Sequence, residues 1–282
     1  MNPVKRITDR MVTRDDLIIA NPNLRAAMPE QAAPHGRLFE LLGVKNGHRI
    51  VREVACNTVV VGGAITALEN LTGVTANWKP TSLNTIHNVE ATAAEGVIPS
   101  LCLFGIGTGG ANLDFGSVID TDIKQRDILS PIPMRYLAGS VPTGDDAAKY
   151  FMKSAGEDFT SWYLKKFSTT PIIKTCWKNA ASEDEDGTEI NADIHDNTAT
   201  DGIETFCEIQ IDMNTLDGRE YFEAVNQLNS ARYNTIGFYT GVPTADGTEY
   251  ANVQLYSAIN FNNRDLSIRS SSSFIYRVYS LI

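Results

Sequence analysis

The sequence predicts a mainly β protein with a few short helices (α+β), built as an antiparallel sheet or sandwich body with an extended N-terminal arm. Residues 206–213 alternate apolar and polar side chains, which is the two-residue period of a half-buried strand. Residues 49–61 are rich in β-branched side chains, which favour strands. The last fifty residues contain three strand-like segments, at 234–242, 249–259 and 274–281, with turns at 245–247 and near 262–263.

The composition is that of an ordinary folded protein. The chain has 282 residues, of which 43% are hydrophobic and 21% are charged, so a disordered or collagen-like chain is excluded. This length suits one large domain or two modest ones. The net charge of −10 argues against a surface devoted to nucleic acid, because phosphate binding needs clustered Lys and Arg.

The amino-terminal region is basic within this acidic chain. Nine Lys and Arg residues lie in positions 1–52 and outnumber the acidic ones, and four prolines with three glycines limit residues 1–50 to short helices joined by turns. Residues 38–42 are expected to form at least one helical turn. We therefore divide the chain into an arm at 1–50 and a β-rich body at 51–282. Docking of the arm on an acidic neighbour is favoured over contact with DNA.

Further elements of the body follow from local patterns. Strands are expected at residues 97–104, with Pro99 at an edge, and at 160–167 and 171–177. Short helices are expected at residues 64–71, at 145–153, and from Asp217, which can cap the helix amino terminus, to about Ser230.

A long acidic loop is predicted at about residues 182–204. Positions 183–204 hold nine acidic residues and no Lys or Arg, which is typical of an exposed hairpin tip. The loop contains an incomplete calcium-binding pattern, in which the positions of an EF-hand are occupied by Ser182, Asp184, Asp186, Gly187 and Asp193. No helices are expected to flank it, so a solvated loop is favoured over a cation site.

One glycine-rich segment fits the pattern of a dinucleotide-binding turn. Gly105 to Gly110 reads G-x-G-x-x-G and follows an apolar strand. A phosphate-binding turn must open a helix, whereas residues 111–117 are poor helix formers and include Gly116. We therefore predict a tight connection at a sheet or subunit contact, with nucleotide binding as the alternative.

No other pattern indicates catalysis, a cofactor or a metal. The four cysteines are widely spaced and the four histidines form no metal-binding arrangement, so reduced thiols and no metal are expected. The start of the chain lacks the apolar core of a signal peptide, and no run is long enough for a membrane span. The sequence predicts a protein that is not an enzyme, with no catalytic, cofactor or metal residues.

Two stretches resemble a family of structural proteins. The first stretch is residues 127–136, which lie after the glycine turn at 105–110. The second stretch covers residues 228–281, with ARYNTIGF at 231–238 and FIYRVY at 274–279. They are similar to virion proteins of large tailed bacteriophages, in particular the neck or collar proteins that join the portal vertex to the tail. The resemblance covers about half of the chain and carries no functional residues over.

The resemblance implies a structural role. Neck proteins form rings of identical subunits around a channel through which DNA passes, so the expected partners are copies of the chain, portal or adaptor proteins, and tail proteins. The expected location is the virion, assembled in the host cytoplasm, with no membrane contact. The alternatives are a baseplate or tail-fibre-linked adaptor with a weak sugar or cation site, and a nucleotide-binding enzyme that uses the turn at 105–110.

Overall fold

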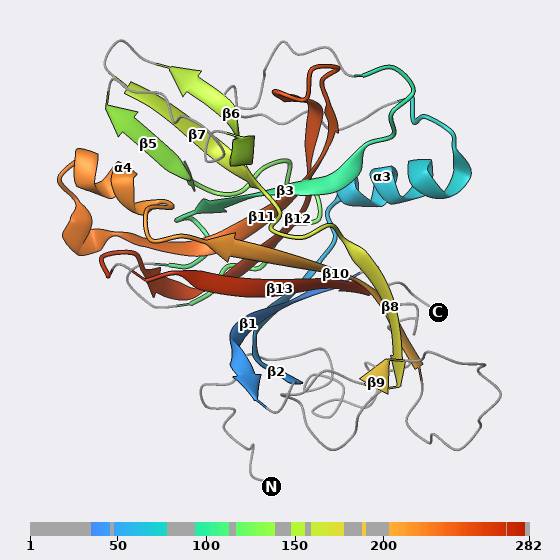
Figure 1. Cartoon of the computed structure of the whole chain (residues 1–282), viewed down its shortest axis with the longest axis horizontal. Helices are drawn as coiled ribbons and strands as arrows, with labels where there is room; N and C mark the ends of the chain where they lie inside the picture. Colours follow the sequence, from blue (N-terminus) through green and yellow to red (C-terminus); the bar gives the residue numbers. More distant parts are fainter. Residues whose placement is uncertain are drawn as a thin grey trace, which may run out of the picture. The chain divides into compact units, whose positions relative to one another are not determined.

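A computed structural model describes residues 35–45, 48–77, 94–112, 117–138, 148–155, 159–177, 188–189, 203–268 and 270–279. The chain groups into two units, one of Met1–Ala33 with Leu281–Ile282 and one of Pro34–Ser280. The described elements belong to the second unit, where the strands form two antiparallel sheets (Figure 1). The predicted β-rich fold with few helices is confirmed.

The first sheet has six strands in the order β2-β1-β13-β10-β8-β9. Its strands are β1 (His35–Lys45), β2 (His48–Thr58), β8 (Ile172–Trp177), β9 (Thr188–Glu189), β10 (Ile203–Met213) and β13 (Ser272–Tyr279). Both ends of this sheet curve away from the other sheet (Figure 1). The face turned away is therefore concave, and we call it the concave face.

The second sheet has seven strands, with β12-β11-β3-β7-β5 in order, β4 beside β3 and β6 beside β7. Its strands are β3 (Ser100–Gly107), β4 (Pro131–Ile132), β5 (Arg135–Ala138), β6 (Tyr150–Ala155), β7 (Phe159–Lys166), β11 (Arg232–Pro243) and β12 (Tyr250–Asp265). Three helices are described, namely α3 (Val61–Thr72), α4 (Arg219–Ala224) and the 3-10 helix η3 (Leu228–Ser230).

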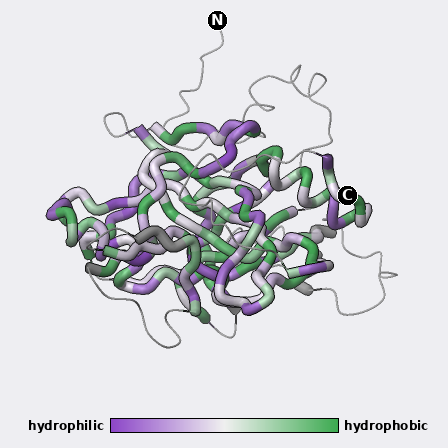
Figure 2. Tube along the Cα trace, turned by 90° about the horizontal axis from the view of Figure 1, so that it is seen from above, coloured by the Kyte–Doolittle hydropathy of each residue, from purple (hydrophilic) through white to green (hydrophobic). Residues whose placement is uncertain are grey.

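The central core lies between the two sheets. Phe238 of β11 stacks on Tyr276 of β13 with ring centroids 3.8 Å apart, and both side chains are fully buried. The Tyr276 hydroxyl lies 2.7 Å from Oγ of Ser257 on β12. Hydrophobic and hydrophilic residues alternate over short distances along the chain (Figure 2). Other members of this core are Leu38, Phe104, Ile106, Ile209, Ile211, Phe222, Ile236, Phe261 and Phe274.

A second core covers the other face of the seven-stranded sheet. Tyr239 follows Phe238 in β11 and therefore points to the opposite side, where its hydroxyl donates to Asp127 Oδ1 at 2.6 Å. The apolar residues around it include Val60, Leu103, Ile128, Phe151, Leu164 and Leu255. The seven-stranded sheet is thus buried on both faces.

The two sheets are joined at one corner, where the chain leaves β2 and meets β12. Val59 forms a backbone bridge with Ser257. The side chains of Asn57 and Thr121 both donate to the carbonyl oxygen of Ala258, at 2.8 and 2.9 Å. These contacts occupy backbone groups on the outer edge of β12.

The structure corrects the prediction for residues 38–42, which are not helical. They lie in β1, which pairs with β2 on one side and β13 on the other. Leu38 packs in the central core and Phe39 on the concave face, and both are buried. Residues 35–45 therefore belong to the body, whereas the arm prediction for residues 1–34 lies outside the described residues.

Three further expectations are wrong. Residues 150–153 were expected to be helical but form β6, and β12 continues through the turn expected near 262–263 as far as Asp265. The helix expected from Asp217 to about Ser230 is broken into α4 and η3, and Gly218 rather than Asp217 is its N-cap. The short helix at 64–71 and the strands at 49–61, 97–104, 160–167, 171–177 and 206–213 are confirmed, with boundaries that differ by a few residues.

Within the described part of the chain, no helix combines the length and the hydrophobicity that a membrane crossing requires.

Candidate functional site

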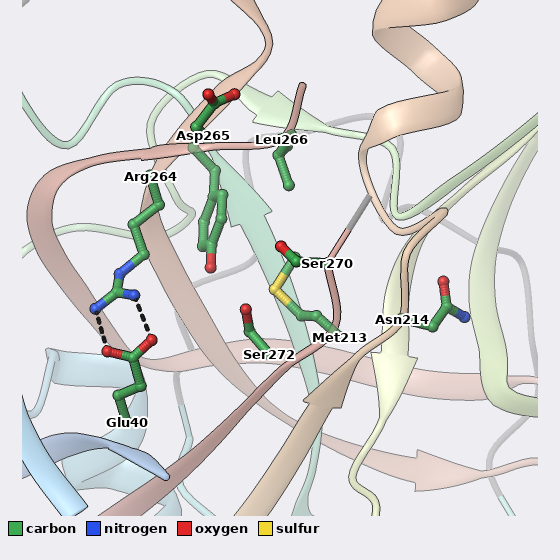
Figure 3. A pocket seen from close by; sticks show the side chains of 9 residues that line it. Glu40, Met213, Asn214, Arg264, Asp265, Leu266, Ser270 and Ser272 are labelled. Carbon is green, nitrogen blue, oxygen red and sulfur yellow. Dashed lines mark hydrogen bonds and ion pairs between the residues drawn. The ribbon is translucent and has the colours of Figure 1, made fainter. Parts of the chain in front are cut away.

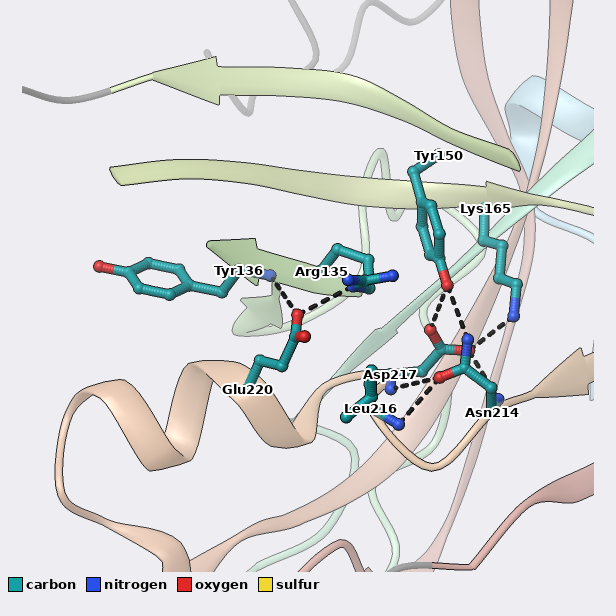
Figure 4. A network of polar contacts seen from close by, with 8 residues as sticks. All are labelled: Arg135, Tyr136, Tyr150, Lys165, Asn214, Leu216, Asp217 and Glu220. Atoms are coloured by element: carbon teal, nitrogen blue, oxygen red, sulfur yellow. Dashed lines mark hydrogen bonds and ion pairs between the residues drawn. The ribbon is translucent and has the colours of Figure 1, made fainter. Parts of the chain in front are cut away.

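A buried ion pair joins β7 to the turn that follows β10 (Figure 4). Lys165 Nζ lies 2.6 Å from Asp217 Oδ2, and the side chains are 8% and 0% exposed. The hydroxyl of Tyr150 on β6 donates to Asp217 Oδ1 at 2.7 Å. Each carboxylate oxygen therefore has a strong donor, which is the condition for burying such a charge.

The turn between β10 and α4 directs Asp217 inward. Asn214 Oδ1 accepts hydrogen bonds from the backbone N–H groups of Leu216 and Asp217, at 2.8 and 3.0 Å. The backbone N–H of Asn214 in turn donates to Asp217 Oδ2 at 2.8 Å. Gly218 follows with φ of 73°, a left-handed conformation that favours glycine. The aspartate is thus fixed by its own turn before it meets the lysine.

A second ion pair continues this network toward α4. Arg135 Nε donates to Glu220 Oε2 at 2.8 Å, and the Arg135 guanidinium lies 5.3 Å from the centre of the Tyr150 ring. Burial, and after it the charge of Asp217, raise the pKa of Tyr150 well above its usual value. The phenol therefore remains a hydrogen-bond donor throughout the ordinary pH range.

A second polar cluster lies on the concave face around Glu208 of β10. Arg49 donates to both of its carboxylate oxygens at 2.9 and 3.0 Å, and Arg277 Nε donates at 3.1 Å. Lys174 Nζ lies 3.0 Å from Glu208 Oε1. The Glu208 side chain is 5% exposed. One buried carboxylate thus meets three cations from three other strands.

The curvature of the six-stranded sheet makes the contact from Arg49 possible. Arg49 lies in β2 and Glu208 in β10, three strand spacings away in the sheet order. On a flat sheet that separation would be about 14 Å, at about 4.8 Å per strand. Because the sheet curves toward this side, the arginine reaches Glu208 across the concave face.

Aromatic rings enclose the cations of this cluster. The Arg277 guanidinium lies 4.9 Å from the Phe39 ring centre and 4.6 Å from that of Phe206. Arg37 lies 5.2 Å from the Phe39 ring and 5.9 Å from the Tyr279 ring. All four distances between a guanidinium and a ring centre are within the roughly 6 Å at which cation–π attraction acts. We call Arg37, Phe39, Arg49, Lys174, Phe206, Glu208, Arg277 and Tyr279 the concave cluster.

The acid sensitivity of the fold should depend on Glu208. Burial alone would raise the pKa of Glu208, but the hydrogen bonds and charges of Arg49, Lys174 and Arg277 outweigh it and lower the pKa to about 2. A lowered carboxylate pKa stabilises the folded protein above the unfolded-state pKa of about 4.3, and this contribution is lost as the pH falls from about 5 to about 2.

Glu208→Gln should therefore lower the free energy of unfolding near pH 7 by about 3 kcal/mol and weaken its pH dependence between about pH 5 and pH 2. Urea unfolding at a series of pH values measures both effects. Glu223→Gln is the control, because that carboxylate is 36% exposed and pairs with a single arginine, Arg219. A Glu208→Gln protein with the acid response of the unmodified protein would contradict the assignment.

A pocket of about 310 Å³ borders the central core (Figure 3). Arg264 donates to both carboxylate oxygens of Glu40, at 2.8 and 3.2 Å, so these two charges are engaged with each other. The remaining lining residues are Met213, Asn214, Tyr233, Asp265, Leu266, Ser270 and Ser272. The glycine turn at 105–110 contributes no residue to this lining.

The glycine segment at 105–110 is a site of close backbone approach. β3 ends at Gly107, and the described residues after it, 108–112 and 117–120, form no helix. A Cβ atom on Gly110 would lie 2.3 Å from the carbonyl oxygen of Asn234. Three successive N–H groups donate within the protein: Thr108 to Ser130 O at 3.0 Å, Gly109 to Leu129 O at 3.1 Å, and Gly110 to Asn234 Oδ1 at 2.6 Å. These donors face protein acceptors, which fits the predicted tight connection at a sheet contact.

The other sequence candidates are only partly covered by the structure. The incomplete calcium pattern at 182–193 lies outside the described residues apart from 188–189, and so do His87 and His195. The described residues contain no cluster of His, Cys, Asp and Glu that could hold a metal ion. Among the described side chains, Cys56, Cys102 and Cys207 are free thiols.

The ion pair between Lys165 and Asp217 was not recognised in the sequence. Asp217 looked like a helix cap, and its partner lies 52 residues earlier in the chain. A signal was present, because Lys165 and Lys166 are adjacent in a strand, and the two-residue alternation turns them to opposite faces of the sheet. Comparison of the chain with protein-family models, with curated proteins and with solved structures finds no match.

Proposed function

We propose that this protein is a structural component of a tailed-phage virion, a neck or collar protein that forms a ring of identical subunits between portal and tail. In this role it contacts copies of itself, portal or adaptor proteins and tail proteins, and DNA passes through the ring. The observation that carries the proposal is the orientation of α3, whose two leucines, Leu68 and Leu71, face outward.

Helix α3 packs against β12 through its small and polar side. The buried residues on that side are Gly62, Gly63, Thr66 and Glu69. Leu68 and Leu71 point away from the body and are 60% and 81% exposed. A surface helix normally buries its apolar stripe, so this reversed arrangement leaves a hydrophobic side without a cover from its own sheet.

Neighbouring residues enlarge the exposed apolar surface. Val74 follows the helix, and Val97 and Ile98 precede β3, and all three are exposed. Asn70 Nδ2 donates to the carbonyl oxygen of Pro99 at 3.4 Å, which brings this segment beside the helix. We call Leu68, Leu71, Val74, Val97 and Ile98 the α3 patch. Grouped apolar surface of this kind is typical of protein–protein contacts.

We expect the α3 patch to contact a second copy of the chain. A closed ring uses two different surfaces of each subunit, one on each side. In the concave cluster, the cations Arg37, Arg49 and Lys174 keep exposed surface, and the acids beside them are Glu208 and the Glu53 that pairs with Arg37. In a chain of net charge −10, this local excess of cations complements the acidic surface of a neighbouring copy.

The combined substitution Leu68→Glu and Leu71→Glu should abolish the oligomer, because it places charge in the centre of an apolar contact. Light scattering after size exclusion measures the mass, and circular dichroism checks that the β-rich fold is kept. Ile268→Glu is the control, because Ile268 is also exposed but lies outside the α3 patch. A ring that survives the double substitution would remove the α3 patch from the proposal.

The place in the virion is tested by imaging. A cryo-EM map of the phage that encodes this chain should contain a ring of this subunit between the portal and the tail. Density for the chain at the baseplate or at a tail fibre would instead support an adaptor role and overturn the neck assignment.

A further inference from the structure

The contact between Lys165 and Asp217 has the components of a condensation reaction. The amino group and the carboxylate are 2.6 Å apart at their nearest atoms. The carboxylate is fully buried, and the amino group nearly so. Lys165 Nζ also donates to the backbone oxygen of Asp212 at 2.7 Å, which fixes the direction of the amine. A nucleophile and an acyl group are therefore held together where little water competes.

We infer that Lys165 and Asp217 form an intramolecular isopeptide bond, in which the lysine Nζ becomes linked to Cγ of the aspartate. The site is a modification site of the folded chain and requires no other protein or cofactor. It uses the amine and the carboxyl group already in contact, and its by-product is one water molecule.

The atoms balance in three steps. A proton first moves from Lys165 Nζ to Asp217 Oδ2 along their hydrogen bond, which turns the ion pair into a neutral amine and a neutral acid. The nitrogen lone pair then attacks Cγ, so that the C–N bond forms and negative charge develops on Oδ1. A second proton passes from nitrogen to Oδ2, the C–Oδ2 bond breaks, and Oδ2 leaves as water. No electrons are gained or lost overall, and no oxidant is needed.

Two donors are placed where this reaction develops charge. Tyr150 O–H is 2.7 Å from Oδ1 and stabilises the oxyanion of the tetrahedral intermediate. The backbone N–H of Asn214 is 2.8 Å from Oδ2 and holds the oxygen that leaves. Asn214 Nδ2 donates to the Tyr150 hydroxyl at 2.9 Å, so the hydroxyl is oriented to donate its own hydrogen to Asp217.

Mass spectrometry of the purified full chain tests the inference. The denatured protein should be lighter than its sequence by one water, about 18 Da. Trypsin does not cleave after an acylated lysine, so the digest should contain residues 154–166 joined to residues 179–219 through Lys165 and Asp217. An intact mass equal to that of the sequence would overturn the inference.

A competing reaction is separated by the same digest. Asp217 precedes Gly218, and an aspartate before glycine can lose water by forming a cyclic imide with the next backbone nitrogen. That product is confined to residues 179–219 and leaves Lys165 open to trypsin. Loss of water without a linked pair of peptides would therefore also overturn the inference.

Three variants complete the test. Lys165→Arg keeps the positive charge but removes the amine, so its mass should equal that of its sequence. Lys166→Arg changes the neighbouring exposed lysine and should retain the link completely. Tyr150→Phe removes the donor to Oδ1 and should slow formation of the link by roughly 100-fold, as loss of an oxyanion donor does in enzymes. If the link formed in Tyr150→Phe as fast as in the unmodified protein, the proposed role of Tyr150 would be excluded.

Discussion

Lys165→Met should lower the free energy of unfolding by about 3 to 5 kcal/mol. The change takes away the amine that pairs with or is linked to Asp217, and so leaves a fully buried carboxylate that cannot recover its hydration. Tyr150 and the backbone of Asn214 still donate to the carboxylate, but neither carries a compensating charge. Urea unfolding followed by circular dichroism gives the difference.

Two comparisons show whether the buried charge is the cause. Lys166→Met removes an exposed lysine from the same strand and should change the stability by less than about 0.5 kcal/mol. Adding Asp217→Asn to Lys165→Met should restore part of the loss, because the amide oxygen still accepts from Tyr150 and no charge is buried. Equal stabilities of the Lys165→Met and Lys166→Met proteins would refute this account.

Phe238→Ala should cost about 3 to 5 kcal/mol, because it opens a cavity at the point where the two sheets meet. The ring is fully buried, stacks on Tyr276 and lies 6.3 Å from the ring centre of Phe167. Its strand is paired on both sides, so the backbone has little freedom to collapse into the space. Thermal unfolding should show a lower midpoint with a single cooperative transition.

The matched control for this substitution is Ile173→Ala. Ile173 lies in the strand β8 but is 79% exposed, so its loss should change stability by no more than about 0.5 kcal/mol. A Phe238→Ala protein that unfolds at the same temperature as the control would show that the stacked pair does not hold the sheets together.

The strands with a two-residue alternation could be predicted from the sequence. In β10, Ile209 and Ile211 face the central core, whereas Glu208 lies on the concave face. The alternation of apolar and polar residues can therefore be read from the sequence of this strand. β1 is different, because Leu38 and Phe39 are adjacent and both buried, one on each face. Burial on both faces removes the alternation, and a short apolar run of this kind cannot be told from a helix. The same holds for Tyr150, Phe151 and Met152 in β6.

The polar networks could not be predicted, because they depend on contacts between distant parts of the chain. Asp217 directly precedes Gly218 in the sequence, and both residue types are common at the N-cap of a helix. Its actual role depends on Lys165 and Tyr150, which reach it only after β6, β7 and the turn after β10 have come together. Glu208 likewise meets Arg49 only because the six-stranded sheet is curved.

The corner between β2 and β12 covers part of the open edge of β12. An open edge strand offers backbone donors and acceptors to any passing chain, and a long strand such as β12 is a strong template for aggregation. At this corner the carbonyl of Ala258 already accepts two side-chain hydrogen bonds, and Ser257 is bridged by Val59. Strand addition along this stretch is therefore blocked. Contacts that this stretch makes with another chain can therefore use its side chains but not these backbone groups.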